Sequence, residues 1–381
     1  MSRRSLPLVS AVRCPDYDPA RVRAALREAL APLGGMGAFV PLGARVLVKP
    51  NFLKTARADQ AVTTHPEVIL AVVEAALAEG ASRVVVGDSP GVHSARAAAK
   101  KLGLLEPLAR LGVEVHDLAE PVTVENPTGR LYKRVELARE VVEADVVLNL
   151  CKLKTHALMA MTLATKNLFG AVVGLRKAAW HLEAGRDPVQ FGRMLVDVAA
   201  RVAPALSIAD AVVAMEGNGP GSGDPRAVGV LAASPDLAVL DQLLCELVGF
   251  PPAELATLRL QWEEGRGPVD LQPPLYAGPP LADLRVSGFR FAKPFAGDPM
   301  PRPLASFGRR LMETRPEIDA RRCTACRLCV THCPATAMVL REGQPAPRIY
   351  RNACIHCFVC QEICPEGAIG VGKGLVRRLI G

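Results

Sequence analysis

CTACRLCVTHCP, from Cys323 to Pro334, and CIHCFVCQEICP, from Cys354 to Pro365, share the spacing C-x2-C-x2-C-x3-C-P. The similarity extends past the cysteines, because residues 333–337 (CPATA) correspond to residues 364–368 (CPEGA). Three closely spaced cysteines can surround one metal cluster, whereas the longer last step turns the fourth thiolate away. The proline that follows fixes its own backbone angle and prevents a helix from continuing into the site. The repeat therefore predicts two metal clusters in one small domain.

This spacing resembles that of bacterial two-cluster 4Fe-4S ferredoxins, in which the fourth cysteine of each run binds the other cluster. The resemblance covers about residues 318–372. The predicted ligands of the first cluster are Cys323, Cys326, Cys329 and Cys364, and those of the second cluster are Cys354, Cys357, Cys360 and Cys333. Zinc is disfavoured because its ligand pairs are separated by a dozen or more residues, and the same spacing argues against disulfides.

The composition of the chain is that of a globular protein. At about 150 residues per domain, a chain of 381 residues is expected to form two or three domains. Half of the residues are apolar and 22% are charged, and no apolar run approaches the ~20 residues that span a bilayer. Thiolates must stay reduced to receive iron, which favours a reducing compartment. The remaining cysteines follow no pairing pattern and are Cys14, Cys151 and Cys245.

The N-terminal Arg3-Arg4 pair superficially resembles a twin-arginine signal. The apolar stretch behind it is interrupted by Arg13 and then by residues 14–16 (CPD), which leaves no proper hydrophobic segment. We therefore expect a first strand here and a cytoplasmic location.

The formal net charge of +8 is spread along the chain and is not concentrated in a basic arm. Aromatic residues make up 4% of the sequence, which leaves few rings for stacking on bases. Nucleic-acid binding is therefore disfavoured. An acidic small substrate, or an acidic protein that donates or accepts electrons, accounts for a diffuse positive charge at least as well.

Strand and helix patterns alternate through the first part of the chain. The expected strands are residues 8–12, 45–48, 83–87, 113–116 and 145–150. The expected helices are residues 18–33, 66–79 and 95–111. Asp18 is placed to cap the first helix and Pro19 to occupy its first position. This alternation predicts an α/β fold with a mostly parallel sheet covered by helices on both faces.

Ligands of such sheets bind outside the carboxyl ends of the strands, so polar segments at those ends are candidates for a site. These segments are residues 49–52 (KPNF), 87–91 (GDSPG) and 151–156 (CKLKTH). Thr64 and His65 precede a helix that begins with Pro66, and the unpaired N–H groups of a helix start attract anions. Residues 164–170 (ATKNLFG) contribute another lysine beside an asparagine.

A glycine-rich segment, residues 215–224 (MEGNGPGSGD), follows the apolar run of residues 206–213. Glycine permits close approach of the backbone to a ligand. The segment lacks the lysine-serine ending of a Walker loop and the G-x-G-x-x-G order before a helix. A turn, a nucleotide-binding loop and another kind of ligand loop all remain open for it.

Together these segments resemble the family catalogued as domain of unknown function 362. The matching segments are Lys49-Pro50-Asn51, Thr64-His65-Pro66, Gly87-Asp88-Ser89-Pro90-Gly91, Lys152-Leu153-Lys154-Thr155-His156, Lys166-Asn167-Leu168-Phe169-Gly170 and Met215-Glu216-Gly217-Asn218-Gly219-Pro220. They occur in order between about residues 8 and 250, and members of this family often carry a ferredoxin-like segment at the C-terminus. The resemblance implies an iron–sulfur protein whose reaction is undetermined.

We divide the chain into three parts on this basis. Residues 1–265 form the α/β domain, residues 266–318 a connector rich in proline and glycine, and residues 319–381 a small α+β ferredoxin-like domain. We expect the connector to pack on the large domain because it contains apolar residues, among them Phe289, Phe291 and Phe295.

The strand ends predict a pocket lined by lysine and histidine. The candidate catalytic residues are His65, His156 and Lys152. The candidate anion-binding residues are Lys49, Asn51, Thr64, Asp88, Ser89, Lys154, Lys166, Asn167, Asn218 and Gly219, and Asp210 is expected nearby. Buried ammonium groups are costly unless paired, so the alternative for each lysine is a solvent-facing position or a carboxylate partner. For His156, an ordinary hydrogen-bonding role is the alternative to a metal ligand.

Three functions are compatible with these observations. In the first, two 4Fe-4S clusters deliver electrons to an anionic substrate or cofactor in the pocket, and a histidine or lysine supplies protons. In the second, the protein is an electron carrier whose α/β domain binds a partner protein and catalyses nothing. In the third, the clusters only stabilise a small domain of a non-redox enzyme. The array of polar residues at the strand ends favours the first function.

Overall fold

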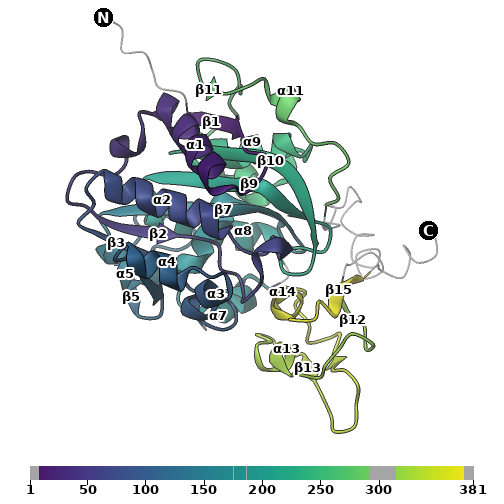
Figure 1. The fold of residues 1–381 in the computed structure, drawn as a ribbon. Helices are drawn as coiled ribbons and strands as arrows, with labels where there is room; N and C mark the ends of the chain where they lie inside the picture. The colour runs from purple at the N-terminus through teal and green to yellow at the C-terminus, as the bar shows by residue number, and fades with distance from the viewer. Residues whose placement is uncertain (1–7, 175, 186, 292–314, 373–381) are drawn as a thin grey trace, which may run out of the picture.

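The computed structural model of the chain describes residues 8–174, 176–185, 187–291 and 315–372 (Figure 1). Within them one large sheet is formed by β1 (Val9–Arg13), β2 (Arg45–Lys49), β3 (Arg83–Asp88), β4 (Glu114–Asp117), β7 (Val146–His156), β8 (Ala160–Thr162), β9 (Leu206–Glu216), β10 (Asp224–Ser234) and β11 (Tyr276–Ala277). The strand order is β11-β1-β10-β9-β7-β2-β3-β4, and β8 pairs with β7 outside this path. A separate hairpin consists of β5 (Pro121–Glu125) and β6 (Arg134–Ala138).

The sheet is mostly parallel, which confirms the predicted fold class. Strand β2 pairs in parallel with both β3 and β7, and the pairs β3–β4, β7–β9 and β1–β11 are parallel as well. Strand β10 is antiparallel to both of its neighbours, β1 and β9, and β8 is antiparallel to β7.

Helices cover both faces of the sheet. One face carries α1 (Pro19–Leu30), α2 (Pro66–Ala78), α3 (Ala95–Lys101) and α4 (Leu105–Arg110). The other carries α5 (Arg139–Glu143), α6 (Ala164–Asn167), α7 (Arg176–Ala184), α8 (Pro188–Val202), α9 (Leu237–Leu247), α10 (Ala256–Glu263) and α11 (Leu281–Leu284). Strand side chains alternate between the two cores, so Val46 and Val48 pack with the first group and Leu47 with the second.

Most of the predicted elements are present, and two predictions are wrong. Helix α1 is capped by Asp18, whose carboxylate accepts from Arg21 N, as expected. The helix expected over residues 95–111 is instead two helices, because the chain passes through Gly103 with a φ of 72°. The strand expected to end at residue 150 instead continues through the polar residues 151–156 as β7.

The two buried lysines in the continuation of β7 form hydrogen bonds to residues elsewhere in the chain. Lys152 Nζ lies 2.8 Å from Asp210 Oδ2 of β9 and 2.7 Å from the Tyr17 hydroxyl. Lys154 Nζ donates to Asn51 Oδ1 at 2.7 Å and to the carbonyl of Val62 at 2.6 Å. Because these contacts satisfy both ammonium groups, a strand with two lysines can be buried along its whole length.

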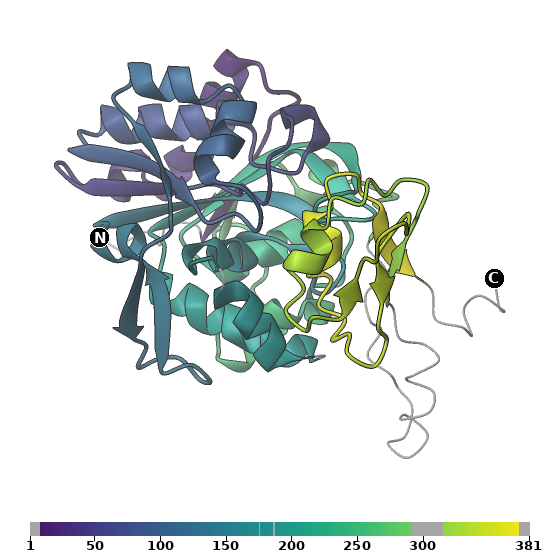
Figure 2. The ribbon, with the colours of Figure 1, turned by 90° about the horizontal axis from the view of Figure 1, so that it is seen from below.

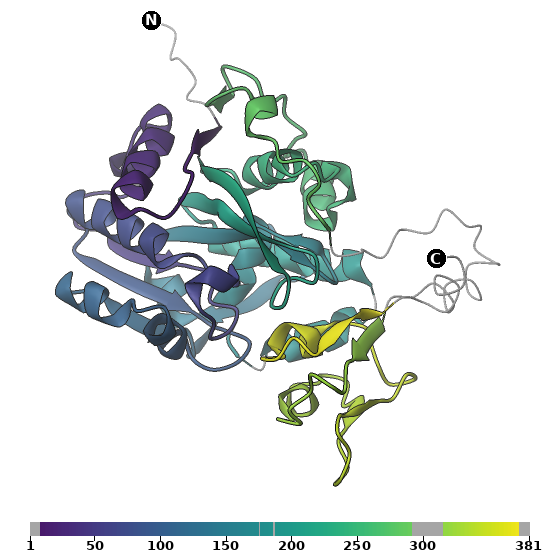
Figure 3. The same cartoon turned by 45° about the vertical axis from the view of Figure 1, so that its right-hand side comes forward.

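A small unit follows the large domain. Strand β12 (Arg315–Ile318) pairs with β15 (Ile369–Gly372), and β13 (Met338–Val339) pairs with β14 (Arg348–Ile349). Helices α13 (Leu328–Thr331) and α14 (Val359–Ile363) occupy matching positions in the two cysteine runs. Figures 2 and 3 show this unit against one end of the α/β domain, with α14 on the side that faces the sheet.

The predicted connector is divided between the two domains. Its start belongs to the large domain, because β11 pairs with β1 and Phe289 is buried in the large core. Its end, β12, belongs to the small unit. The part in between, including Phe295, and the Arg3-Arg4 pair lie outside the described residues. No helix within the described ranges is long and apolar enough to cross a membrane.

We predict that Lys152→Met lowers the free energy of unfolding by about 3–5 kcal/mol, because it leaves the buried carboxylate of Asp210 without its cation. Urea unfolding followed by circular dichroism measures this change. The matched control is Lys101→Met, at an exposed position, where a change below about 0.5 kcal/mol is expected. Equal stabilities of the two variants would contradict the structural role of the ion pair.

Candidate functional site

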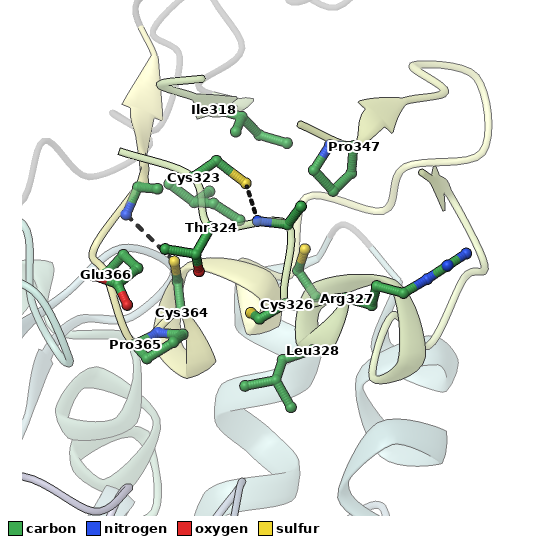
Figure 4. Close-up of a pocket in the computed structure, with 14 residues that line it drawn as sticks. Ile318, Cys323, Thr324, Cys326, Arg327, Leu328, Pro347, Cys364, Pro365 and Glu366 are labelled. Carbon is green, nitrogen blue, oxygen red and sulfur yellow. Dashed lines mark hydrogen bonds between the residues drawn. The ribbon is translucent and has the colours of Figure 1, made fainter. Parts of the chain in front are cut away.

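The first predicted set of cysteines surrounds one small cavity. Cys323, Cys326, Cys329 and Cys364 all line it, together with residues of both cysteine runs. Figure 4 shows the sulfurs of Cys323, Cys326 and Cys364 around the same space. Cys364 comes from the second run, so the crossing of the fourth cysteine that the spacing implies is present in the chain's geometry.

The second set surrounds a separate cavity of the same kind. Its lining includes Cys354, Cys357, Cys360 and, from the first run, Cys333. Within the described residues, no group of three histidine, cysteine or acidic side chains is spaced to hold a single metal ion. A four-iron cluster is bound through separate irons, so its ligands stand farther apart than those of one ion.

Backbone N–H groups point at several of these sulfurs, an arrangement that suits thiolates bound to iron. The hydrogen bonds run from Ala325 N to Cys323 Sγ (3.4 Å), from Ala337 N to Cys333 Sγ (3.2 Å) and from Ala368 N to Cys364 Sγ (3.3 Å). The last two occupy equivalent places in the sequence repeat. Both cysteine sets therefore fit the two clusters that the spacing predicts.

A larger cavity of about 420 Å³ lies between the α/β domain and the small unit. Seven of the predicted catalytic and anion-binding residues line it: Asn51, Asp88, Ser89, Lys154, His156, Lys166 and Asn167. The small unit closes it with Cys333, Val359, Glu362 and Ile363, among others. Because Cys333 also lines the second cysteine cavity, the two cavities share a wall.

A chain of amides and one lysine forms part of the cavity lining. Asn51 accepts from Lys154 Nζ at 2.7 Å and donates from Nδ2 to Asn167 Oδ1, also at 2.7 Å. Asn167 in turn donates to Asn149 Oδ1 at 2.8 Å. Burial lowers the pKa of Lys154 well below its usual range, and the nearby charge of Lys166 lowers it further.

His156 contacts the small unit across the cavity. Its Nε2 lies 2.9 Å from Glu362 Oε1, and its Nδ1 accepts from the backbone N–H groups of Leu158 and Met159. Since Nδ1 is an acceptor, the neutral ring carries its hydrogen on Nε2, toward Glu362. Burial lowers the pKa of His156 to about 4. Burial alone would raise the pKa of Glu362, but His156 and Lys166 hold it at about 2.

Lys166 and two residues that the sequence did not indicate, Lys177 and His181, also line the cavity. Among the described residues, the Lys166 ammonium has no hydrogen-bond or ion-pair partner, and burial lowers its pKa. Lys177 Nζ donates to the Ser89 carbonyl, and burial lowers the pKa of Lys177 to about 7. His181 stacks on Phe191, and its buried Nδ1 has no hydrogen-bond partner in the described part of the chain.

Other predicted residues lie outside this cavity, in a buried network at the start of α2. Lys152 and Tyr17 both contact Asp210, and the Tyr17 ring stacks on His65 with centroids 3.5 Å apart. His65 Nδ1 accepts from Glu67 N, which makes His65 the cap of α2. Burial lowers the pKa of His65 to about 4. His65 and Lys152 are thus separated from His156, the third candidate catalytic residue.

Lys49 and Thr64 are also satisfied within the protein. Lys49 Nζ pairs with Asp88 Oδ1 at 2.9 Å and is fully buried, so the carboxylate partner considered as its alternative is present. The Thr64 hydroxyl donates to the carbonyl of Leu150 at 2.8 Å and accepts from Asn51 N.

The glycine-rich segment joins β9 to β10 and holds the small unit. Gln361 Nε2 of α14 donates to the carbonyls of Asn218 (2.9 Å) and Gly219 (3.1 Å). A Cβ at Gly219 would lie 2.3 Å from the Thr155 carbonyl, which explains the need for glycine there. Asn218 and Gly219 therefore lie at the domain interface and do not line the large cavity.

Comparison with known proteins agrees with both halves of this description. Residues 46–246 match the family described as domain of unknown function (DUF362), and residues 315–365 match the 4Fe-4S dicluster domain. The chain belongs to the DUF362 family and carries a ferredoxin-type iron–sulfur domain. It is 44% identical over 267 residues to a thylakoid-associated protein of Synechocystis sp., covering 68% of this chain and 80% of that protein.

Two solved structures are similar over part of their length. The lactate racemase apoprotein of Thermoanaerobacterium thermosaccharolyticum has a TM-score of 0.43 and 14% identity, over 66% of this chain and 58% of that one. A Thermotoga maritima protein has a TM-score of 0.32 and 13% identity, over 52% and 51%. The chain thus spans less than two thirds of either solved structure.

We predict that the chain purified without oxygen contains about eight irons and that Cys364→Ala retains about four. Adding Cys323→Ala to Cys364→Ala removes no further iron, because both residues are assigned to the same cluster. Adding Cys357→Ala instead removes the remainder. Iron and sulfide analysis measures these values. If both double variants lost the same amount of iron, the assignment of Cys364 to the cluster of Cys323 would be wrong.

Proposed function

We propose that the protein is an iron–sulfur oxidoreductase that reduces an anionic substrate or cofactor bound in the cavity between its two domains. One observation carries this proposal: the wall of the cavity combines lysines of the α/β domain with Cys333, a proposed ligand of the second cluster. When bound by the two cysteine sets, the clusters would supply single electrons at this wall.

The charge of the cavity supports an anionic ligand. Lys154, Lys166 and Lys177 line it, whereas the carboxylate of Asp88 is already paired with Lys49 and that of Glu362 approaches His156. The partly buried Lys166 ammonium has no direct ion-pair partner among the described residues, and burial lowers its pKa, so an anion beside it would stabilise its charged form. The apolar side chains of Phe169 and Ile363 also line the cavity, and an apolar lining strengthens electrostatic attraction.

Lys177 is the residue best suited to supply a proton. Its pKa of about 7, which burial causes, lets the ammonium form release a proton near neutral pH. His156, with a pKa of about 4, is neutral at that pH, and its Nε2–H is directed at Glu362. We assign proton donation to Lys177 and orientation of the ligand to the Asn51–Asn167 pair.

We further propose that the protein works in the cytoplasm and receives electrons from an acidic partner protein, consistent with its net charge of +8. The similarity to a thylakoid-associated protein makes binding to a membrane surface the alternative location. An electron carrier without its own reaction is the alternative function. A carrier would have no need for an anion site beside Cys333.

We predict that sulfate binds to the oxidised protein and that Lys166→Met weakens binding about tenfold or more, because a charge-assisted hydrogen bond is lost. Isothermal titration calorimetry measures the affinity. Lys101→Met, at an exposed position outside the cavity, is the matched control and should bind as the wild type does. Equal sulfate affinity in Lys166→Met and wild type would rule out the cavity as the anion site.

We predict that sulfate affinity falls as the pH rises through about 7, because Lys177 loses its positive charge there. Sulfate stays fully ionised across this range, so the change reports on the protein. A lysine with a lowered pKa is cationic only below that value, which gives the direction of the effect. In Lys177→Met the pH dependence around neutrality should disappear. A wild-type affinity that is constant between pH 6 and 8 would contradict this assignment.

A further inference from the structure

Lys54 links the α/β domain to the proposed ligands of the first cluster. It lies in the loop after β2, and its side chain reaches into the small unit, where Nζ donates to the carbonyl of Cys364 at 2.7 Å. The residue is 7% exposed. A buried lysine that spans 310 positions of sequence to reach a cysteine of the cluster unit needs a reason, since burial of an ammonium group is costly.

A glycine beside Lys54 leaves room for its side chain at the domain interface. A Cβ at Gly221 would lie 3.2 Å from Lys54 Nζ and 2.6 Å from the carbonyl of Glu362, so only glycine fits between them. The preceding residue, Leu53, accepts from Gly91 N through its carbonyl, which holds the loop in place. Loops of the α/β domain thus enclose the ammonium group against the last turn of α14.

The charge of Lys54 is not cancelled by a direct partner. Within the described residues no carboxylate forms an ion pair with it, and its hydrogen bond goes to a neutral carbonyl. Burial lowers the pKa of Lys54, while the charges of Cys364, Glu362 and Glu366 act in the opposite direction. The hydrogen bond to the Cys364 carbonyl places the positive charge beside the backbone of a proposed cluster ligand.

We propose that Lys54 is a positioning residue that raises the reduction potential of the first cluster. Reduction adds one electron, and therefore one negative charge, to a cluster already bound by four thiolates. An ammonium group buried next to Cys364 stabilises this added charge, and the low dielectric of the interface strengthens the effect. Among the described residues, the hydrogen bond of Lys54 goes to Cys364 of the first set and to no cysteine of the second set, so the second cluster is affected less.

The inference rests on the two cluster sites and not on the anion cavity. A purely structural lysine would tie the domains together, and its loss would loosen α14 without a selective change at one cluster. If the charge matters, the midpoint potential depends on the charge of residue 54, whether or not the hydrogen bond to Cys364 is kept. The two roles are therefore separable by substitutions that keep either the charge or the bond.

The test uses the full chain, purified without oxygen, with the midpoint potential of each cluster measured by redox titration followed by electron paramagnetic resonance. The electrons come from the chemical reductant of the titration, so no substrate is needed and the result is decisive even if the cavity binds no anion. Cys364→Ala, which removes the first cluster, identifies the signal of the second. Iron content of each variant is measured in the same samples.

We expect Lys54→Met to lower the midpoint potential of the first cluster more than that of the second. Lys54→Gln keeps a donor toward the Cys364 carbonyl without the charge, and it should lower the first-cluster potential in the same way. Lys54→Arg keeps the charge and should leave that potential close to the wild-type value. If Lys54→Met fails to hold both clusters, Lys54→Gln carries the test. An unchanged first-cluster potential in Lys54→Gln, or an equal shift of both clusters, would overturn the proposal.

The charge control is Lys101→Met, which removes one exposed ammonium group from α3. Because solvent and salt screen an exposed charge, neither midpoint potential should change in this variant. A shift in Lys101→Met as large as that in Lys54→Met would show that net charge, and not the buried position of Lys54, sets the potential, and would also overturn the proposal.

Discussion

The contacts of one short helix, α14, determine the geometry of both candidate sites. On one side its chain segment supplies Cys360 and Cys364 to the two cysteine cavities. On the other side Gln361 bonds to the glycine-rich segment and Glu362 approaches His156. The cluster unit is therefore fixed to the α/β domain through the same residues that surround its cysteines. The large cavity exists because these contacts close one of its walls.

The cost of burying positive charge separates the lysines of the α/β domain into two groups. Lys49 and Lys152 are paired with the carboxylates of Asp88 and Asp210, and they stabilise the ends of the strands. Lys166 has no such partner among the described residues and faces the cavity. An anion bound beside Lys166 would pair with its charge, whereas Lys49 and Lys152 are already paired. This difference is why we propose the cavity, and not the paired network, as the anion site.

Much of the fold and the proposed cluster ligands follow from local patterns, whereas the composition of the cavity does not. The cap at Asp18 and the alternation of strand and helix depend on residues near one another in sequence. Lys152 instead donates to the Tyr17 hydroxyl, 135 positions away in the sequence, and no local sequence pattern predicts this contact. Lys177 and His181 belong to a segment with an ordinary amphipathic pattern, so their place in the cavity emerges only from tertiary packing.

If an anion binds next to the second cluster, the midpoint potential of that cluster should respond to sulfate. An anion in the cavity adds negative charge on the far side of Cys333, which disfavours reduction of the cluster that Cys333 is proposed to bind. We expect saturating sulfate to lower the midpoint potential of the second cluster, to change the first less, and to have no effect in Lys166→Met. Unchanged potentials at both clusters with bound sulfate would show that the anion does not bind beside the second cluster.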